Sequence, residues 1–351
     1  MMDTIKLPFY ARLALVLFSI VLILFLITTG KTLFIPLFFA LLIAVLLYPL
    51  VHLLEKWHLG RGISAMIAIL LFMLVGTSFI YFFSIQIANF SQDLPELQKR
   101  VTDIFHQLQH WVNKTYHIDR NQQSEYISNS TNSLISTLVN SLGNTLLTVT
   151  DFLVYVIFIT FYTFFILFYR KMLKRFILAL FKTAYRAKVN EVVNETRTVI
   201  NSYVLGLVTE MVILIIVNCS IFTIMGIKYA LLLGMLAAVL NIIPYLGIYM
   251  ATVIAMIVTF ANSGGTPAIE VGVALMAIHF VDANIMMPRI VGKRVNINPF
   301  ITIIAVIAGN IIWGIPGMFL FIPLTAIIKI ICERVEDLRP WAILIGVESK
   351  D

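Results

Sequence analysis

Long apolar runs recur along this chain, and most could cross a lipid bilayer as a helix. A helix needs about 20 predominantly apolar residues to span the hydrocarbon core. Runs of that kind cover roughly residues 10–29, 32–54, 62–87, 149–169, 198–226 and 268–288. Two further apolar stretches, 229–262 and 299–332, are too long for one upright helix. The sequence therefore predicts an all-α polytopic membrane protein with about eight membrane segments.

The composition agrees with lipid as the solvent. Of the 351 residues, 60% are hydrophobic and only 12% are charged, whereas a soluble domain carries about 25% charged residues. The formal net charge is +7. Membrane proteins concentrate Lys and Arg in cytoplasmic loops, which explains such a charge without nucleic acid. We expect the lipid bilayer as a partner and no nucleic-acid partner.

The basic residues predict an orientation. The segment 170–188 holds seven Lys and Arg residues and no acidic residue, so the positive-inside rule makes it cytoplasmic. Its apolar residues recur at spacings of three and four, which predicts an amphipathic helix on the inner membrane surface. Counting back along the spans places the N-terminus inside. The polar stretch 88–148, also with helical spacing, lies outside.

A second cytoplasmic basic motif constrains the C-terminal third. It consists of Pro288, Arg289, Gly292, Lys293 and Arg294. If 229–262 crossed the membrane once, this motif would lie outside, against the positive-inside rule. A re-entrant helical hairpin in 229–262 removes the conflict, and a second one in 299–332 returns the C-terminus to the cytoplasm. The alternative is eight plain spans with one exception to the rule.

Both long stretches contain a break at their middle. The first lies at 241–247 and the second at 309–317, and Asn-Ile-Ile occurs in each. Matched breaks of this kind point to inverted hairpins around a transport site. Unwound backbone at membrane depth is tolerated where protein or water surrounds it. The candidate break or gate residues are Asn241, Pro244, Gly247, Gly309, Asn310, Trp313, Gly314, Pro316 and Gly317. Trp313 has two alternative roles, as a gate residue or as a packing wedge.

These features predict six regions. They are three N-terminal spans (1–87), an extracytoplasmic helical insert (88–148), a fourth span (149–169), a basic amphipathic cytoplasmic segment (170–197), a C-terminal transport core (198–333) and a cytoplasmic tail (334–351).

Two acidic residues fall inside apolar runs, which is energetically costly and points to function. Glu210 lies near the middle of the fifth span, with Asn218 on roughly the same face. Asp282 lies near the end of the sixth, close to Asn284. We take these four residues as candidates for transport or coupling. The structural alternatives are an ion pair of Asp282 with Arg289 or Arg294, and an interhelical hydrogen bond from a protonated Glu210.

The sequence does not indicate an enzyme. It lacks a phosphate-binding loop of the Walker type, and its six histidines and two cysteines have no metal-ligand spacing. A membrane protease or transferase would need paired catalytic groups, and the acidic residues are scattered along the chain. We expect no metal and no cofactor.

Three C-terminal motifs resemble those of a known family. They are NIIPYLG (241–247), DANIMMPRIVGKRVNINP (282–299) and GNIIWGIPGMFLFIPLTAIIK (309–329). With the polar insert and SYVLGL (202–207), they are similar to the autoinducer-2 exporter (AI-2E) family of bacterial membrane transporters. The resemblance implies a location in the bacterial inner membrane and a homo-oligomer, a pentamer being the expected form.

The resemblance implies two activities that need different sites. One is export of the quorum-sensing signal autoinducer-2, a small polar solute that Asn241 and Asn310 could bind, with proton coupling through Glu210 or Asp282. The other is sodium(lithium)/proton antiport, in which a monovalent cation and a proton exchange at these carboxyl groups. We predict polar-solute export and keep antiport as the alternative. A second alternative is an envelope scaffold that acts through the external insert.

Overall fold

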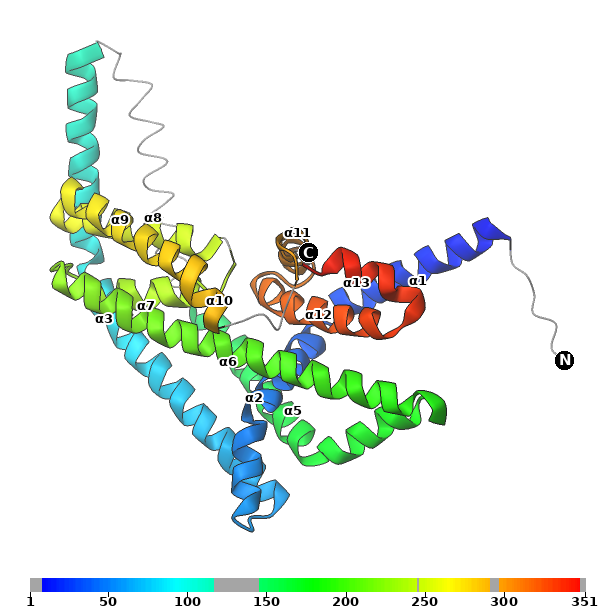
Figure 1. Cartoon of the computed structure of the whole chain (residues 1–351). Helices are drawn as coiled ribbons and strands as arrows, with labels where there is room; N and C mark the ends of the chain where they lie inside the picture. Colours follow the sequence, from blue (N-terminus) through cyan, green and yellow to red (C-terminus); the bar gives the residue numbers. More distant parts are fainter. Residues whose placement is uncertain (1–7, 117–144, 245, 291–296, 348–351) are drawn as a thin grey trace. The chain divides into compact units, whose positions relative to one another are not determined.

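The chain is an all-α polytopic membrane protein. The computed structural model describes residues 8–116, 145–244, 246–290 and 297–347. Eight helices in these ranges are long and apolar enough to cross a membrane. They comprise the six predicted spans and the longer arm of each broken stretch, which confirms the predicted number of segments (Figure 1).

The N-terminal half consists of long helices. They are α1 (Phe9–Thr29), α2 (Lys31–Lys56), α3 (Arg61–Tyr116), α5 (Thr145–Ala179) and α6 (Arg186–Ile224), with a 3₁₀ turn at Thr183–Tyr185 between the last two. Shorter elements follow: α7 (Ala230–Leu240), α8 (Leu246–Ser263), α9 (Gly265–Val281), the π-helical turn η2 (Asp282–Met286), α10 (Met287–Ile290), α11 (Pro299–Trp313), α12 (Ile315–Arg334), the 3₁₀ turn η3 (Glu336–Leu338) and α13 (Arg339–Ile345).

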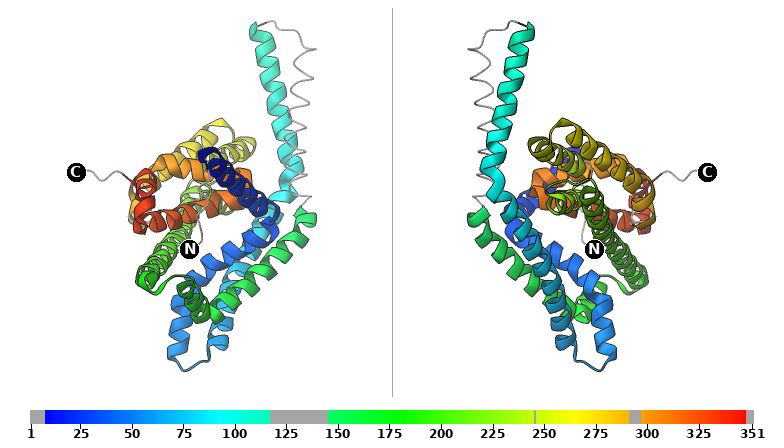
Figure 2. Two further views of the ribbon diagram at one scale, coloured as in Figure 1. Left: turned by 90° about the vertical axis from the view of Figure 1, so that its right-hand side faces the viewer. Right: turned by 90° about the vertical axis from the view of Figure 1, so that its left-hand side faces the viewer.

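Several predicted region boundaries fall inside continuous helices. The end of the third span, residue 87, lies within α3, which continues to Tyr116 (cyan in Figure 2). The boundary at 169/170 lies within α5, and the one at 197/198 within α6. Around 169/170 and 197/198 the sequence contains neither Pro nor Gly, so no helix-breaking residue ends α5 or α6 at these two boundaries. The basic segment is therefore not one separate helix but the end of α5, a turn and the start of α6.

The helices divide into two compact units. One unit contains residues 1–52, 155–200 and 296–351, and the other contains 53–154 and 201–295. The division falls inside α2, α5 and α6, so each of these helices contributes to both units.

In the first unit, α11 and α12 form a tight helical hairpin. The break lies at Gly314, whose φ of +66° suits glycine. Gly309 and Gly317, predicted as break residues, instead lie inside the two helices and face each other. A Cβ on Gly309 would lie 2.3 Å from the Gly317 carbonyl oxygen, so the backbones can approach this closely only without side chains.

Trp313 packs this hairpin against the N-terminal helices. Its indole is buried and its Nε1 donates a hydrogen bond to the Ile27 carbonyl oxygen at 3.1 Å. The ring also lies against Phe38 of α2 and Phe321 of α12. These contacts favour the packing wedge over the gate.

In the same unit, polar contacts fix the end of α12 and the start of α11. Arg334 of α12 forms ion pairs with Glu191 and Glu195 of α6, with N–O distances of 2.9 and 2.8 Å. Asn298 caps α11 by accepting the Ile301 N–H. Its amide also donates to the carbonyl oxygens of Leu344 and Gly346. The C-terminal helix α13 is thereby fixed to the start of α11.

In the second unit, α7, α8 and α9 pack on the end of α6. Their common core contains Phe222, Ile227, Ala230, Leu233, Ala237, Ile248, Ala251, Ala255, Val271 and Leu275. The alanines let α7 and α8 lie close together. The chain turns between these helices at 241–244, after which Gly247 lies against Leu240: a Cβ there would be 1.7 Å from the Leu240 carbonyl oxygen. The first broken stretch therefore folds into two arms, α7 and α8, joined at this turn.

The long helix α3 is tied to the start of α7. The Asp93 carboxylate accepts a hydrogen bond from the Tyr229 hydroxyl and pairs with Lys228 Nζ at 2.9 Å. The hydrogen bond to Asp93 raises the pKa of Lys228 above its usual value. Farther along α3, Arg100 donates to the Asn262 carbonyl oxygen at the end of α8. The outer part of α3 therefore contacts both arms of the first hairpin.

Because α11 and α12 approach each other so closely, even a methyl group added at Gly309 should destabilise the fold. Gly309→Ala forces the two backbones apart, and we expect a loss of about 1–3 kcal/mol in the free energy of unfolding, as for other overpacked sites. The matched control is Gly76→Ala in α3, where a Cβ would meet no atom within 4 Å. Thermal unfolding in detergent should show a lower midpoint for the first variant only. Equal midpoints would contradict the close approach.

Candidate functional site: a buried pair of carboxyl groups

The first carboxyl group of the site comes from α6. Glu210 lies on the apolar part of this helix, and only 6% of the residue is exposed. A carboxyl group buried in this way needs hydrogen-bond donors, because transfer from water without them is costly. The donor that reaches Glu210 comes from a different helix.

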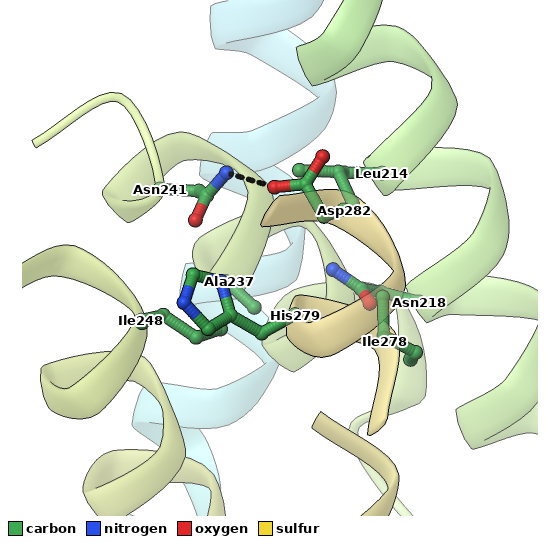
Figure 3. Close-up of a pocket in the computed structure, with 8 residues that line it drawn as sticks. All are labelled: Leu214, Asn218, Ala237, Asn241, Ile248, Ile278, His279 and Asp282. Carbon is green, nitrogen blue, oxygen red and sulfur yellow. Dashed lines mark hydrogen bonds between the residues drawn. The ribbon is translucent and has the colours of Figure 1, made fainter. Parts of the chain in front are cut away.

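That donor is Asn241, the residue that ends α7. Its backbone N–H still bonds to Ala237, and the chain then leaves the helix because Pro244 follows within the turn. The side-chain Nδ2 donates to Glu210 Oε1 at 3.3 Å and to Asp282 Oδ2 at 3.2 Å. One amide group thus joins two carboxyl groups from separate parts of the chain. Figure 3 shows its hydrogen bond to Asp282.

The second carboxyl group, Asp282, begins the π-helical turn η2. π-Helical turns are rare, and they occur frequently at functional sites. Asp282 is 3% exposed. It forms no ion pair with Arg289, which is exposed on α10, so the structure does not contain the alternative of a structural ion pair between these two residues. Two helical turns separate them, and Asp282 points into the protein while Arg289 does not.

The site leaves polar atoms without partners. Within the described residues, Glu210 Oε2 and Asp282 Oδ1 form no hydrogen bond, and the same holds for Asn218 Oδ1 and His279 Nδ1. Such buried polar atoms are uncommon and call for an explanation. Here they gather around one amide and one small cavity, as expected of a site that binds and releases something.

The cavity lies beside Asp282. Its lining residues are Leu214, Asn218, Ala237, Asn241, Ile248, Ile278, His279 and Asp282 (Figure 3). The space open to the centre of a water-sized molecule is about 10 Å³, which is room for about one water. A ring-shaped polar solute does not fit into the cavity in this conformation.

The structure groups some predicted site residues and separates others. Glu210, Asn218, Asn241 and Asp282 come together. Asn284 is exposed, and its amide donates to the Phe280 carbonyl oxygen of its own helix. Asn310 is exposed on α11, and Pro316 lies in the first turn of α12; both belong to the first unit. Pro288 lies in α10, whereas Gly292, Lys293 and Arg294 lie outside the described residues.

Two inferences from the sequence need correction. The acidic residues are scattered along the sequence, yet Glu210 and Asp282 share one hydrogen-bond donor. The spacing of His279 fits no metal site, yet this residue lines the cavity. The sequence does contain a pattern that indicates His279. This residue precedes Asp282 by three positions, which places both on one helix face. Within the described residues no group of three metal-ligating side chains is found.

Membrane-length helices around a buried acidic site define a multi-pass membrane protein with the features of a transporter. Comparison with known proteins gives the family: the model of the AI-2E family transporter matches residues 13–337. The chain therefore belongs to the AI-2E transporter family.

Several relatives match over most of their length. The chain is 28% identical to the putative transport protein YueF of Bacillus subtilis, over 84% of this chain and 82% of that one. It is 24% identical to the putative transport protein YrrI of the same organism, over 86% of each chain. It is 23% identical to the AI-2 transport protein TqsA of Escherichia coli, over 97% of each chain.

The shared amide predicts a strong energetic coupling. Asn241→Leu leaves two buried carboxyl groups without their donor, and we expect a loss of about 1–3 kcal/mol in the free energy of unfolding. In a Glu210→Met background only one carboxyl group loses the donor, so the loss should be smaller by about 0.5 kcal/mol or more.

Chemical unfolding in mixed micelles measures all four members of this cycle. Asn284→Leu is the control, because this exposed amide bonds, among the described residues, to the carbonyl oxygen of Phe280 four residues before it. We expect it to change the free energy of unfolding by less than about 0.5 kcal/mol. Additive effects of Asn241→Leu and Glu210→Met would contradict the shared hydrogen bond.

Proposed function

We propose that this chain is a secondary transporter that couples solute movement to protons at the Glu210–Asn241–Asp282 site. The observation that carries the proposal is the single amide that donates to two buried carboxyl groups. Such intramembrane acids commonly mark ion pathways and proton relays.

The hydrogen bonds suggest why the transferred species includes a proton. Two carboxylates offer four oxygen atoms, and Asn241 supplies donors to only two of them. A proton on one carboxyl group adds the missing donor and removes one of two like charges, which repel when buried together. Protonation therefore favours the closed arrangement that joins α6, α7 and η2.

Loss of the proton would favour a different arrangement. The two carboxyl groups lie on α6 and η2, so repulsion between the carboxylates pushes these elements apart. This weakens the Asn241 hydrogen bonds that tie the turn between α7 and α8 to them. Opening at this turn would admit solute from one side. Alternating access requires this kind of coupling between a titrating group and a movable element.

For the solute, we propose export of a small polar molecule, with autoinducer-2 as the candidate. The support is the family and the name of TqsA, an AI-2 transport protein that aligns over 97% of both chains. Asn241 could hydrogen-bond to hydroxyl groups once the site opens. We further propose the bacterial inner membrane, cytoplasmic termini and a homo-oligomer, on the basis of the charge distribution and the family.

A second candidate is exchange of a monovalent cation for protons, and the cavity supports it. Its volume suits one small ion or water rather than a ring. Asn218 and Asp282 are among its lining residues, and each has a side-chain oxygen with no hydrogen-bond partner among the described residues. Hard cations prefer oxygen ligands.

Transport by the purified protein in liposomes tests the coupling. With a pH-sensitive dye inside, addition of autoinducer-2, or of Na⁺ or Li⁺, should produce proton movement above that of empty liposomes. Glu210→Gln and Asp282→Asn should each lower this flux by about tenfold or more, as when about 1.4 kcal/mol is lost. Glu270→Gln is the matched control, because Glu270 is an exposed acid on α9.

The substrate that evokes the flux distinguishes the two candidates. A response to autoinducer-2 alone supports solute export, and a response to Na⁺ or Li⁺ alone supports antiport. If the two acidic-site variants match the wild type while flux persists, the carboxyl pair is not the coupling site.

A further inference from the structure

Basic and apolar side chains gather where α5 ends and α6 begins. Residues 171–188, called the basic corner from here on, comprise the end of α5, the 3₁₀ turn Thr183–Tyr185 and the start of α6 (green in Figure 1). They include six Lys and Arg residues and no acidic residue. All of them belong to the first compact unit.

Two of the six basic residues fix the shape of the corner. Lys174 Nζ donates to Asn194 Oδ1 at 3.3 Å, which joins the end of α5 to the start of α6. Arg186 Nε donates to the Phe181 carbonyl oxygen, also at 3.3 Å. The corner is therefore a defined surface rather than a loose loop.

The other four basic residues have no partner for their charge. Their side chains are exposed and form no ion pair or hydrogen bond within the described part of the chain; they are Lys171, Arg175, Lys182 and Lys188. The next acidic residues along α6, Glu191 and Glu195, both pair with Arg334 instead. The corner thus carries positive charge that the described residues do not neutralise.

Large apolar side chains are exposed beside these charges. Phe176 and Leu180 of α5 are 59% and 65% exposed, and Phe181 at the turn is 45% exposed. At about 100° per residue, Phe176 and Leu180 lie on the helix face opposite to Lys171 and Arg175. A helix with basic residues on one face and aromatic residues and leucine on the other is typical of the boundary between headgroups and acyl chains.

Anionic phospholipid matches both properties of the corner. Water would solvate the charges but not the apolar side chains. The corner also follows directly on the apolar part of α5, so it lies next to the bilayer. A second copy that met it with its own corner would bring like charge and be repelled. Anionic headgroups supply the missing negative charge and attract basic segments next to a membrane span.

We propose that the basic corner binds anionic phospholipid of the adjacent leaflet. The four unpaired basic residues contact the phosphate groups, and Phe176, Leu180 and Phe181 lie among the acyl chains. Because Arg334 ties the start of α6 to the end of α12, bound lipid stabilises the packing of the first unit. The proposal does not depend on the transport function.

Fluorescence quenching tests the binding. The full chain carries a bimane dye on Phe181→Cys, with Cys219→Ala and Cys332→Ala, in phosphatidylcholine vesicles that contain spin-labelled phosphatidylglycerol or spin-labelled phosphatidylcholine. We expect the anionic quencher to reach half of its effect at about a fivefold lower content. About 0.5 M KCl should remove most of this preference. Equal quenching by the two lipids overturns the proposal, as does a dye that neither lipid quenches.

A pair of matched variants tests which charges bind the lipid. Lys171→Gln with Arg175→Gln should lose most of the preference for the anionic quencher. The control, Lys31→Gln with Lys99→Gln, removes the same charge from exposed residues outside the corner and should keep it. A preference that falls equally in both variants would be an effect of net charge and would contradict binding at the corner.

Unlabelled chains give a measurement that does not depend on the dye. Phosphatidylglycerol added to the detergent should raise the midpoint of thermal unfolding more than phosphatidylcholine does, in the wild type and in the control. The two lipids should act equally on the Lys171→Gln, Arg175→Gln variant. Equal midpoints in the two lipids for the wild type would overturn the proposal.

Discussion

A single side-chain amide connects the elements that form the candidate site. Asn241 donates to Glu210 and to Asp282, and both carboxyl groups are buried. Burial of a carboxyl group is unfavourable unless donors compensate. The site therefore depends on the place where α7 ends, because the end of that helix carries Asn241 to a position between α6 and η2.

The helix breaks matter as much as the acids. Pro244 and Gly247 end one helix and let the next begin against it, and Gly309 and Gly317 bring α11 and α12 into backbone contact. In lipid, burial of apolar surface does not favour helix association, so close packing of small residues takes over that role. Both hairpins follow this rule, and the turn of the first carries Asn241 of the acidic site.

Much of the fold could be predicted from the sequence. Membrane-length apolar runs gave the helical class and the number of segments, and Pro and Gly marked both breaks. The predicted boundaries at 87, 169 and 197 fell inside helices, because polarity changes at a membrane surface without ending a helix. Of the site, the sequence indicates Glu210, Asn218, Asn241 and Asp282, each by itself. Metal-ligand spacing does not indicate His279, because this histidine fits no such pattern.

The sequence by itself determined that this chain is a membrane protein with costly acidic residues inside its helices, since hydropathy and charge are local properties. Only the tertiary structure decided that Glu210 and Asp282 meet on one amide, and that Asn218 and His279 share a water-sized cavity. These facts depend on how α6, α7 and α9 pack. Packing contacts join residues far apart in the chain, so local sequence periodicity cannot predict them.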